Sequence, residues 1–171
     1  SLINNTWSGY LTTGDASNTR TDYQPLSYGA ELLTDGDMED DPTNNWTDVD
    51  ATLAEETGDP GAGLKSLKVT ATYGAHANAK QDIVTVAQEL HKFTFIYKDT
   101  ETDRSEYSIY DNSNAASILT RTRNANSTSW SENQVYYFIT PAGCVSVRVA
   151  LHGEDIGDLV FFDAASVRQV Q

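Results

Sequence analysis

The stretch Ser66-Leu67-Lys68-Val69-Thr70-Ala71-Thr72 decides the fold. Apolar and polar residues alternate along it, so Leu67, Val69 and Ala71 share one face of an extended chain. A period of two is typical of a β-strand that buries one face and leaves the other polar. The sequence therefore predicts a strand here, with its apolar face turned toward a core.

Segments of the same character continue along the chain. We predict further strands at residues 81–86, 93–97, 106–111, 117–123, 135–139, 145–151 and 159–170. The pair that flanks Asn112-Ser113-Asn114 forms a predicted hairpin, because turn residues separate two alternating segments. The one helical candidate, residues 86–92, is shorter than most globular helices. Many short strands without a long helix predict an all-β sandwich.

Composition and charge narrow the class of protein. The chain has 171 residues, 39% of them hydrophobic, which suits one globular domain with a core of its own. Its formal net charge is −14, and such a surface repels nucleic-acid phosphates and anionic membranes. We therefore expect no nucleic-acid partner and no membrane. The charge suits cation binding or a basic partner, and simple solubility remains an alternative.

The chain has one cysteine, Cys144. A single cysteine cannot form an internal disulfide. Cys144 begins an apolar alternation that includes Val145 and Val147, so we expect a buried structural thiol rather than a nucleophile.

Residues 1–29 differ from the rest of the chain. They are rich in Thr, Asn, Asp and Gly and keep no regular hydrophobic period. We expect an extended N-terminal arm or linker at 1–29 and a single domain at 30–171. An arm of this kind packs on its own domain or on a neighbouring subunit, and we favour the neighbour, in a capsid or a homo-oligomer.

Three motifs occur in a set order. Residues 32–39 read Leu-Leu-Thr-Asp-Gly-Asp-Met-Glu, with Trp46 shortly after them. Residues 59–69 form a Gly-rich turn followed by Ser-Leu-Lys-Val, and Val160-Phe161-Phe162-Asp163 lies near the end. This order resembles the jelly-roll carbohydrate-binding modules, a galactose-binding-like family, over about residues 30–171. Two details depart from that pattern: Met38 stands where the family has Phe, and Val167 comes later than expected.

The resemblance implies a jelly-roll β-sandwich that holds a structural calcium ion. Carried over to this sequence, the carboxylate ligands are Glu39 and Asp163, with Asp37 as a further candidate, and backbone carbonyls near 61–66 complete the shell. Calcium takes six to eight oxygen ligands, several of which a fixed loop must present. The alternative is a solvated acidic turn at Glu39 and an ordinary strand-end residue at Asp163.

The resemblance also implies glycan binding. Aromatic rings stack on the C–H faces of sugars, and a few polar groups set the orientation. Tyr107 and Tyr110 lie beside the predicted hairpin, and Trp130 lies in a polar stretch, so these three are the candidate ligand-binding residues. For each of them, packing within the fold is the alternative. We expect Trp46 in the core.

Catalysis has little support in the sequence. His76, His91 and His152 lie in separate segments, and no nucleophile elbow, zinc-protease motif or phosphate-binding loop occurs. Chance pairs of carboxylates occur in any chain this acidic, so they do not by themselves indicate a glycosidase. We predict that the protein is not an enzyme.

Two functions from different classes follow. The first is a structural protein on a virion surface, such as a capsid decoration protein of a tailed phage; a chain that stands alone without a signal peptide, with a polar arm, favours it. The second is a carbohydrate-binding module of a secreted glycan-degrading enzyme, with residues 1–29 as its linker. An adhesin or surface-layer domain is a third, minor possibility.

Overall fold

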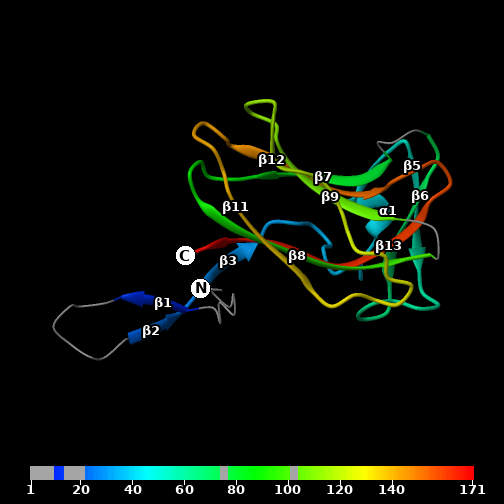
Figure 1. Cartoon of the computed structure of the whole chain (residues 1–171), viewed down its shortest axis with the longest axis horizontal. Coiled ribbons are helices and arrows are strands. Elements are labelled where there is room, and N and C mark those ends of the chain that lie inside the picture. The colour runs from blue at the N-terminus through cyan, green and yellow to red at the C-terminus, as the bar shows by residue number, and fades with distance from the viewer. Residues whose placement is uncertain (1–9, 14–21, 74–76, 101–103) are drawn as a thin grey trace, which may run out of the picture.

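Two antiparallel sheets form the body of the protein (Figure 1). The structure, a computed structural model, describes residues 10–13, 22–73, 77–100 and 104–171. One sheet has five strands in the order β10-β9-β12-β7-β4, and the other has the order β11-β8-β13-β6-β5, with β3 paired to β13. This arrangement confirms the predicted all-β jelly-roll sandwich.

The strand bounds are as follows. In the five-stranded sheet they are β4 Thr47–Val49, β7 Asn78–Val84, β9 Ser105–Asp111, β10 Ala116–Arg123 and β12 Ser146–Gly153. In the second sheet they are β3 Tyr28–Glu31, β5 Ala51–Glu56, β6 Ser66–Ala71, β8 Leu90–Asp99, β11 Gln134–Ile139 and β13 Leu159–Val170. One short helix, α1 at Pro42–Asn45, begins after Asp41, whose side chain accepts a hydrogen bond from the Asn44 amide.

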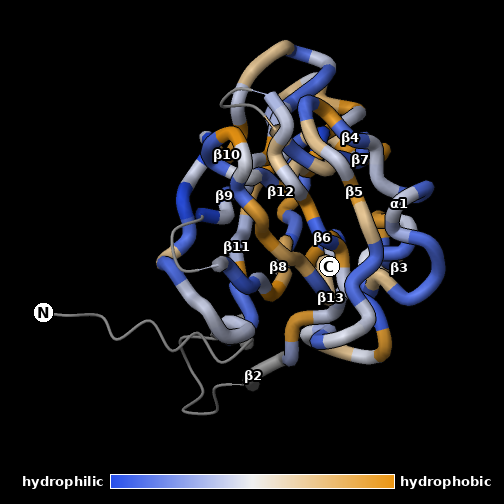
Figure 2. The backbone as a smooth tube through the Cα atoms, turned by 90° about the vertical axis from the view of Figure 1, so that its right-hand side faces the viewer, coloured by the Kyte–Doolittle hydropathy of each residue, from blue (hydrophilic) through white to orange (hydrophobic). Residues whose placement is uncertain are grey.

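The core lies between the sheets, and Figure 2 shows strongly hydrophobic segments in strands of both layers. Leu67 and Val69 are fully buried, as their alternation predicts. Trp46 is 2% exposed, which confirms its place in the core. Cys144 is also fully buried, and burial raises the pKa of its thiol, so the prediction of a structural thiol is confirmed.

An irregularity in β13 accounts for the late position of Val167. The pairing of β13 with β8 shifts register between Asp163 and Ser166, and Ala164 has a φ of +48°. One extra residue in a strand forms a bulge that bends the strand. Ala165, within the bulge, and Val167, after it, are both buried in the core, so the extra residue does not disturb the inner face.

The N-terminal segment includes a small hairpin. β1 (Tyr10–Thr13) pairs with β2 (Asp22–Pro25), and within the described residues neither strand joins a sheet of the body. Figure 1 shows this hairpin extending away from the sandwich. Docking of the arm on a neighbouring subunit stays a prediction. No helix among the described residues is long and apolar enough to span a membrane.

Candidate functional site

The outer face of the five-stranded sheet carries the main cluster of polar side chains. β12 lies in the middle of this sheet, between β9 and β7. Val147, Val149 and Leu151 are fully buried in the core. Because side chains alternate along a strand, Arg148 and His152 point to the opposite, outer face.

The strand register arranges the outward side chains of β9, β12 and β7 in three rows. Each row crosses the three strands in that order. We call these nine residues the polar face: Tyr110, Arg148 and Asp82; Ser108, Ala150 and Lys80; Glu106, His152 and Asn78. The middle row contains two small side chains, so the longer side chains of the outer rows stand on either side of it.

In the first row, Arg148 forms a two-point ion pair with Asp82. Its Nε and Nη2 donate to the two carboxylate oxygens of Asp82 at 2.9 and 3.3 Å. The side-chain amide of Asn112 donates to the same carboxylate at 3.1 Å. The hydrogen bond from Arg148 is the main reason that the pKa of Asp82 lies below its usual value. Both side chains are thereby held in place, and the guanidinium keeps unused N–H donors.

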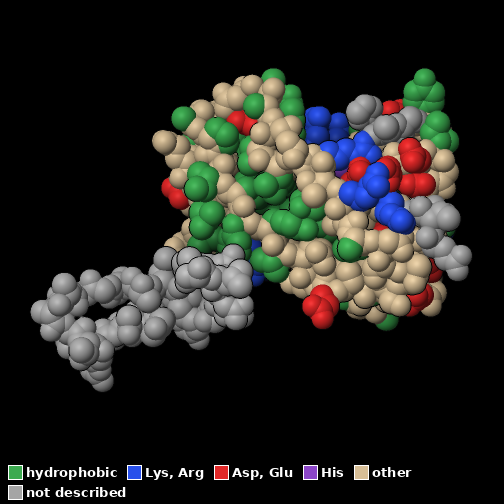
Figure 3. Space-filling view, in the orientation of Figure 1, with side chains coloured by type: hydrophobic (Ala, Val, Ile, Leu, Met, Phe, Trp, Pro, Cys, Tyr) green, Lys and Arg blue, Asp and Glu red, His purple; other side chains and the backbone are tan. Residues whose placement is uncertain are grey.

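The third row is a second charged network. Glu106 accepts a hydrogen bond from Arg121 and lies 3.9 Å from the Nε of Arg123, which also pairs with Glu154. Ser108 Oγ and His152 Nε2 are 2.9 Å apart. Figure 3 shows positive and negative side chains gathered in the region that Figure 1 labels β9. Glu106, His152 and Asn78 are 8%, 6% and 8% exposed, so this row holds the strands together, and the accessible donors and acceptors of the polar face are those of the first row.

Tyr110 is the one Tyr, Phe or Trp ring in the three rows. It is partly exposed, and its cross-strand neighbours are Arg148 on β12 and Ser117 on β10. An accessible ring beside fixed polar groups is the arrangement that aromatic stacking on a sugar requires. Tyr110 therefore stays a candidate ligand-binding residue.

Tyr107 is not available to a ligand, and we correct that prediction. Its side chain points into the core, and the residue is 6% exposed. Its ring centroid lies 4.2 Å from that of Tyr136 and 5.5 Å from that of Phe95. Nearness to the hairpin does not tell which side of the sheet a ring faces. Tyr107 and Tyr110 are an odd number of residues apart, so they face opposite sides of the strand, and only one of them can lie on an exposed face.

Trp130 lies at the other sheet and does not meet Tyr110. Its indole Nε1 donates to the Asp59 carbonyl at 3.1 Å, and the Lys98 ammonium lies 5.4 Å from its ring centroid. The ring packs so closely on Gly61 that a Cβ there would lie 2.6 Å from it. Trp130 therefore joins the loop that contains Asp59 and Gly61 to its own loop. Its role in ligand binding stays a prediction.

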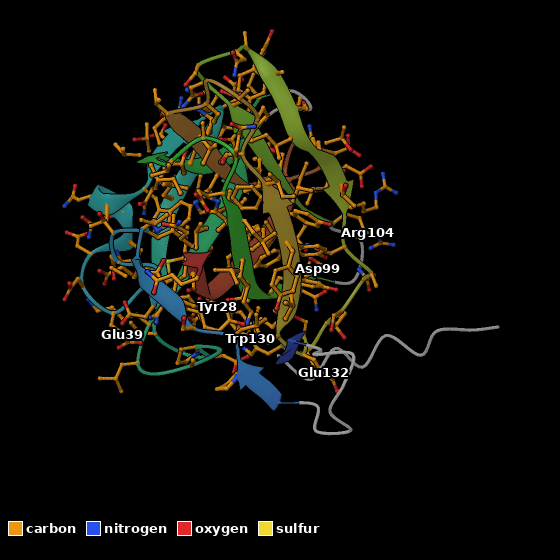
Figure 4. All side chains as sticks on the ribbon, turned by 90° about the vertical axis from the view of Figure 1, so that its left-hand side faces the viewer. Tyr28, Glu39, Asp99, Arg104, Trp130 and Glu132 are labelled. Carbon is orange, nitrogen blue, oxygen red and sulfur yellow. The ribbon has the colours of Figure 1, made fainter. Side chains whose placement is uncertain are left out.

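Two of the three candidate metal ligands come together at the turn of residues 61–65. Glu39 Oε1 accepts the Leu64 and Lys65 amide hydrogens at 2.8 and 3.2 Å, and Asp163 Oδ2 accepts that of Ala62 at 2.7 Å. Burial raises the pKa of Asp163 to about 6, and the charge of Glu39 adds to the increase. Figure 4 shows Glu39 at the lower end of the sandwich.

The surroundings of this pair fit a cation in part. Ser66 Oγ, adjacent in sequence to the same turn, is buried and has no hydrogen-bond partner. A cation within reach of Ser66 Oγ would give that oxygen the partner it lacks, whereas both carboxylates already accept backbone amide hydrogens. Asp37, in contrast, is exposed, and the described residues contain no group of three or more His, Cys, Asp or Glu side chains placed to hold a metal. Any calcium ion would therefore depend on Glu39, Asp163 and neutral oxygens.

Sequence reasoning missed most of the polar face. Arg148 and Asp82 are single polar residues inside predicted strands, and Glu106 stands at the start of another. Their signal is the polar half of each alternating pattern. It becomes a site only when the register places three such strands side by side.

The fold is shared with carbohydrate-binding modules of known structure. The CBM22-1 xylan-binding domain of Paenibacillus barcinonensis Xyn10C matches with a TM-score of 0.65 and 13% identity, over 85% of this chain and 96% of that domain. A family 16 carbohydrate-binding module matches with a TM-score of 0.59 and 16% identity, over 80% of this chain and 98% of that one.

One match is part of a phage protein. The chain is similar to 21% of the enzymatically active domain of bacteriophage CBA120 tailspike protein 4, with a TM-score of 0.61 and 13% identity. No protein-family model matches the sequence, and no curated protein matches it. At these identities the likeness shows the fold: the chain has the jelly-roll fold of carbohydrate-binding modules.

Proposed function

We propose that this protein is a non-catalytic glycan-binding module and that the polar face is its binding surface. The observation that carries the proposal is the partly exposed ring of Tyr110 beside the fixed Arg148–Asp82 pair. The matches to carbohydrate-binding modules over nearly their whole length support it. They also support a binding role rather than a catalytic one.

The chemistry of the first row suits a hydroxyl-rich ligand. One sugar ring would stack on Tyr110, which covers its C–H face. Adjacent hydroxyl groups would take the remaining N–H donors of Arg148 and the remaining lone pairs of Asp82. Since both side chains already hold each other in position, binding would order few further groups and would lose little conformational entropy.

An NMR titration tests the location of the site. Oligosaccharides from a panel of soluble plant and microbial glycans would be added to isotope-labelled protein. We expect amide shifts concentrated in β9, β12 and β7 around Tyr110, Arg148 and Asp82. Shifts concentrated instead around Trp130 and Gly61, at the other sheet, would contradict the assignment of the polar face.

We propose further that Glu39 and Asp163 hold a structural calcium ion at the turn of residues 61–65. The buried Ser66 hydroxyl, which has no hydrogen-bond partner, supports this, as does the approach of the two carboxylates of Glu39 and Asp163 to the same turn. When bound, the ion would fix the turn against β13. The ion has no part in the proposed glycan contacts.

A virion surface is a second setting proposed for the same module. The observation that favours it is the tailspike match, since a domain of this fold occurs inside that phage protein. Mass spectrometry of purified virus particles from a host that carries the gene would test it. Peptides of this chain in the particle would support the virion setting, and their presence only in the culture supernatant would favour secretion.

A further inference from the structure

Strand β11 forms one edge of its sheet. It pairs with β8 through the register Gln134↔Phe95 to Ile139↔Leu90, and no other described strand pairs with it. An edge strand presents unpaired backbone N–H and C=O groups, and proteins usually protect such an edge with charged residues, Pro or a bulge. Residues 134–139 read Gln-Val-Tyr-Tyr-Phe-Ile and contain none of these.

The outward side chains of this edge are apolar and exposed. Val135 and Tyr137 are each 45% exposed, and Ile139 is 62% exposed. Figure 3 shows hydrophobic side chains over the part of the molecule where Figure 1 draws β11. Six residues of high β-propensity with no charge and no Pro form a segment that readily adds a further strand.

The charge pattern identifies a site where copies of this chain can approach each other. The sequence has 25 Asp and Glu residues, yet none lies between Asn133 and Gly153. Elsewhere the net charge of −14 makes two copies repel. The β11 strand itself is thus an apolar strip without acidic residues, and Glu132 and Glu89 lie beyond its two ends.

The strand is also complementary to itself. If two copies of β11 pair antiparallel about Tyr137, that tyrosine faces its own counterpart. Val135 then faces Ile139 of the second copy, and Ile139 faces Val135. Aromatic pairs and pairs of β-branched residues across strands are both stabilising. In the same register Glu132 faces Ala142, so no two carboxylates are opposed.

We infer that the protein forms a two-fold symmetric dimer through β11, in which two β11 strands pair antiparallel about Tyr137 and join the two sheets into one. A two-fold axis makes the same patch serve both subunits. Because one six-residue strand gives a small interface, the dimer is in reversible exchange with the monomer. The inference is independent of glycan binding, since the polar face belongs to the other sheet.

Charge exchange at Val135 and Ile139 tests the dimer. Two double variants are needed, Val135→Glu with Ile139→Glu and Val135→Lys with Ile139→Lys. Their same-sheet neighbours Thr94 and Leu90 are uncharged, which limits damage to the fold. We expect sedimentation velocity to show wild-type dimers that increase with concentration, monomers for each double variant alone, and dimers again when the two variants are mixed.

Three results would overturn the inference. They are a wild-type monomer up to about 1 mM, double variants that dimerise as the wild type does, or a mixture that stays monomeric although each variant is folded by circular dichroism. Ile156→Lys, at a residue 66% exposed and outside β11, is the matched control and should dimerise normally.

A cross-link tests the register. With Tyr137→Cys, the two new thiols face each other across the axis, within the range that a disulfide can bridge. Mild oxidation should produce a covalent dimer on a non-reducing gel, whereas Val84→Cys, at an 81% exposed residue outside β11, should remain monomeric. Equal cross-linking of the two variants would contradict pairing about Tyr137.

Discussion

Tyr110 and Tyr107 lie three positions apart on β9 and face opposite sides of the sheet. Tyr107 packs against Tyr136 and Phe95 in the core, whereas Tyr110 stands on the polar face beside Arg148. The same residue type therefore has a structural role at one position and a proposed binding role at the other. This difference can be measured.

Tyr107→Ala should lower the free energy of unfolding by about 3–5 kcal/mol, the usual cost of removing a buried aromatic ring. Tyr110→Ala should lower it by only about 0.5 kcal/mol or less, as is typical of surface positions. Urea denaturation of both variants beside the wild type measures the two values. A large loss for Tyr110→Ala would mean that its ring supports the fold and would weaken its assignment to a ligand.

His91 gives the fold a predicted pH dependence. The residue is 1% exposed, and its ring stacks on Phe138 at 5.2 Å. Burial lowers the pKa of His91 below its ordinary value of 6.5. As pH falls below about 6.5, His91 takes up a proton in the unfolded chain but stays neutral in the folded protein. Protonation therefore favours the unfolded state, and the free energy of unfolding should decrease.

The measurement is chemical denaturation at a series of values from about pH 7.5 to about pH 5, for wild type and His91→Phe. The variant should lose less stability than the wild type over this range. Parallel curves for the two proteins would show that His91 does not supply the pH dependence.

At the scale of elements, the turn of residues 61–65 depends on Gly63. This glycine has a φ of +62°, and a Cβ there would lie 1.9 Å from Glu39 Oε1. Gly157 has a similarly positive φ of +93°, but nothing lies within 4 Å of its Cβ position. Alanine at Gly157 therefore tests backbone strain alone, and alanine at Gly63 tests the strain together with the Glu39 contact.

We expect Gly157→Ala to cost about 1–2 kcal/mol of unfolding free energy and Gly63→Ala to cost more. Thermal or urea unfolding of the two variants provides the comparison. Equal losses would indicate that Glu39 moves aside without cost and that its contact with the turn does not hold the turn in place.

The strands were easier to predict than their exact ends. The alternation in 66–72 and 145–151 predicted β6 and β12, and the last strand was predicted at 159–170, where β13 lies. β4 and α1 were not predicted because three or four residues are too few for a period to stand out, and β5 was not predicted because its sequence, Ala-Thr-Leu-Ala-Glu-Glu, has a single large apolar residue. The bulge after Asp163 was visible only as a delayed valine.

At the scale of the whole molecule, neither the Glu39–Asp163 pair nor the polar face could be predicted from any single segment of the sequence. Glu39 and Asp163 are far apart in sequence, and the family resemblance, not a local pattern, brought them together. The polar face required the register of β9, β12 and β7, which sequence alternation leaves open. Asp37 lies two residues from Glu39 but is exposed, so proximity in sequence was misleading there.

Calcium should stabilise the whole fold if the Glu39–Asp163 site holds it. A ligand that binds only the folded state raises the free energy of unfolding, by about 2.7 kcal/mol at a hundred times its dissociation constant. We expect calcium to raise the melting temperature of the wild type and chelator to lower it again. Glu39→Gln with Asp163→Asn should remove this response, and Asp37→Asn, the matched control, should keep it.

An unchanged melting temperature with and without calcium, after chelator treatment, would contradict the proposed ion. A response that persists in Glu39→Gln with Asp163→Asn would place the ion elsewhere. Neither result would affect the proposal for the polar face, because the two sites lie at different sheets.

The most direct test of the central claim is affinity electrophoresis of the wild type, Tyr110→Ala, Arg148→Ala and Tyr73→Ala through gels that contain soluble polysaccharides. Tyr73 is 72% exposed and lies outside the polar face, so its variant is the control. We predict that at least one polysaccharide retards the wild type and Tyr73→Ala. The Tyr110 and Arg148 variants should bind about tenfold more weakly, a loss of about 1.4 kcal/mol. No retardation by any polysaccharide, or equal retardation of all four proteins, would contradict a glycan-binding role for the polar face.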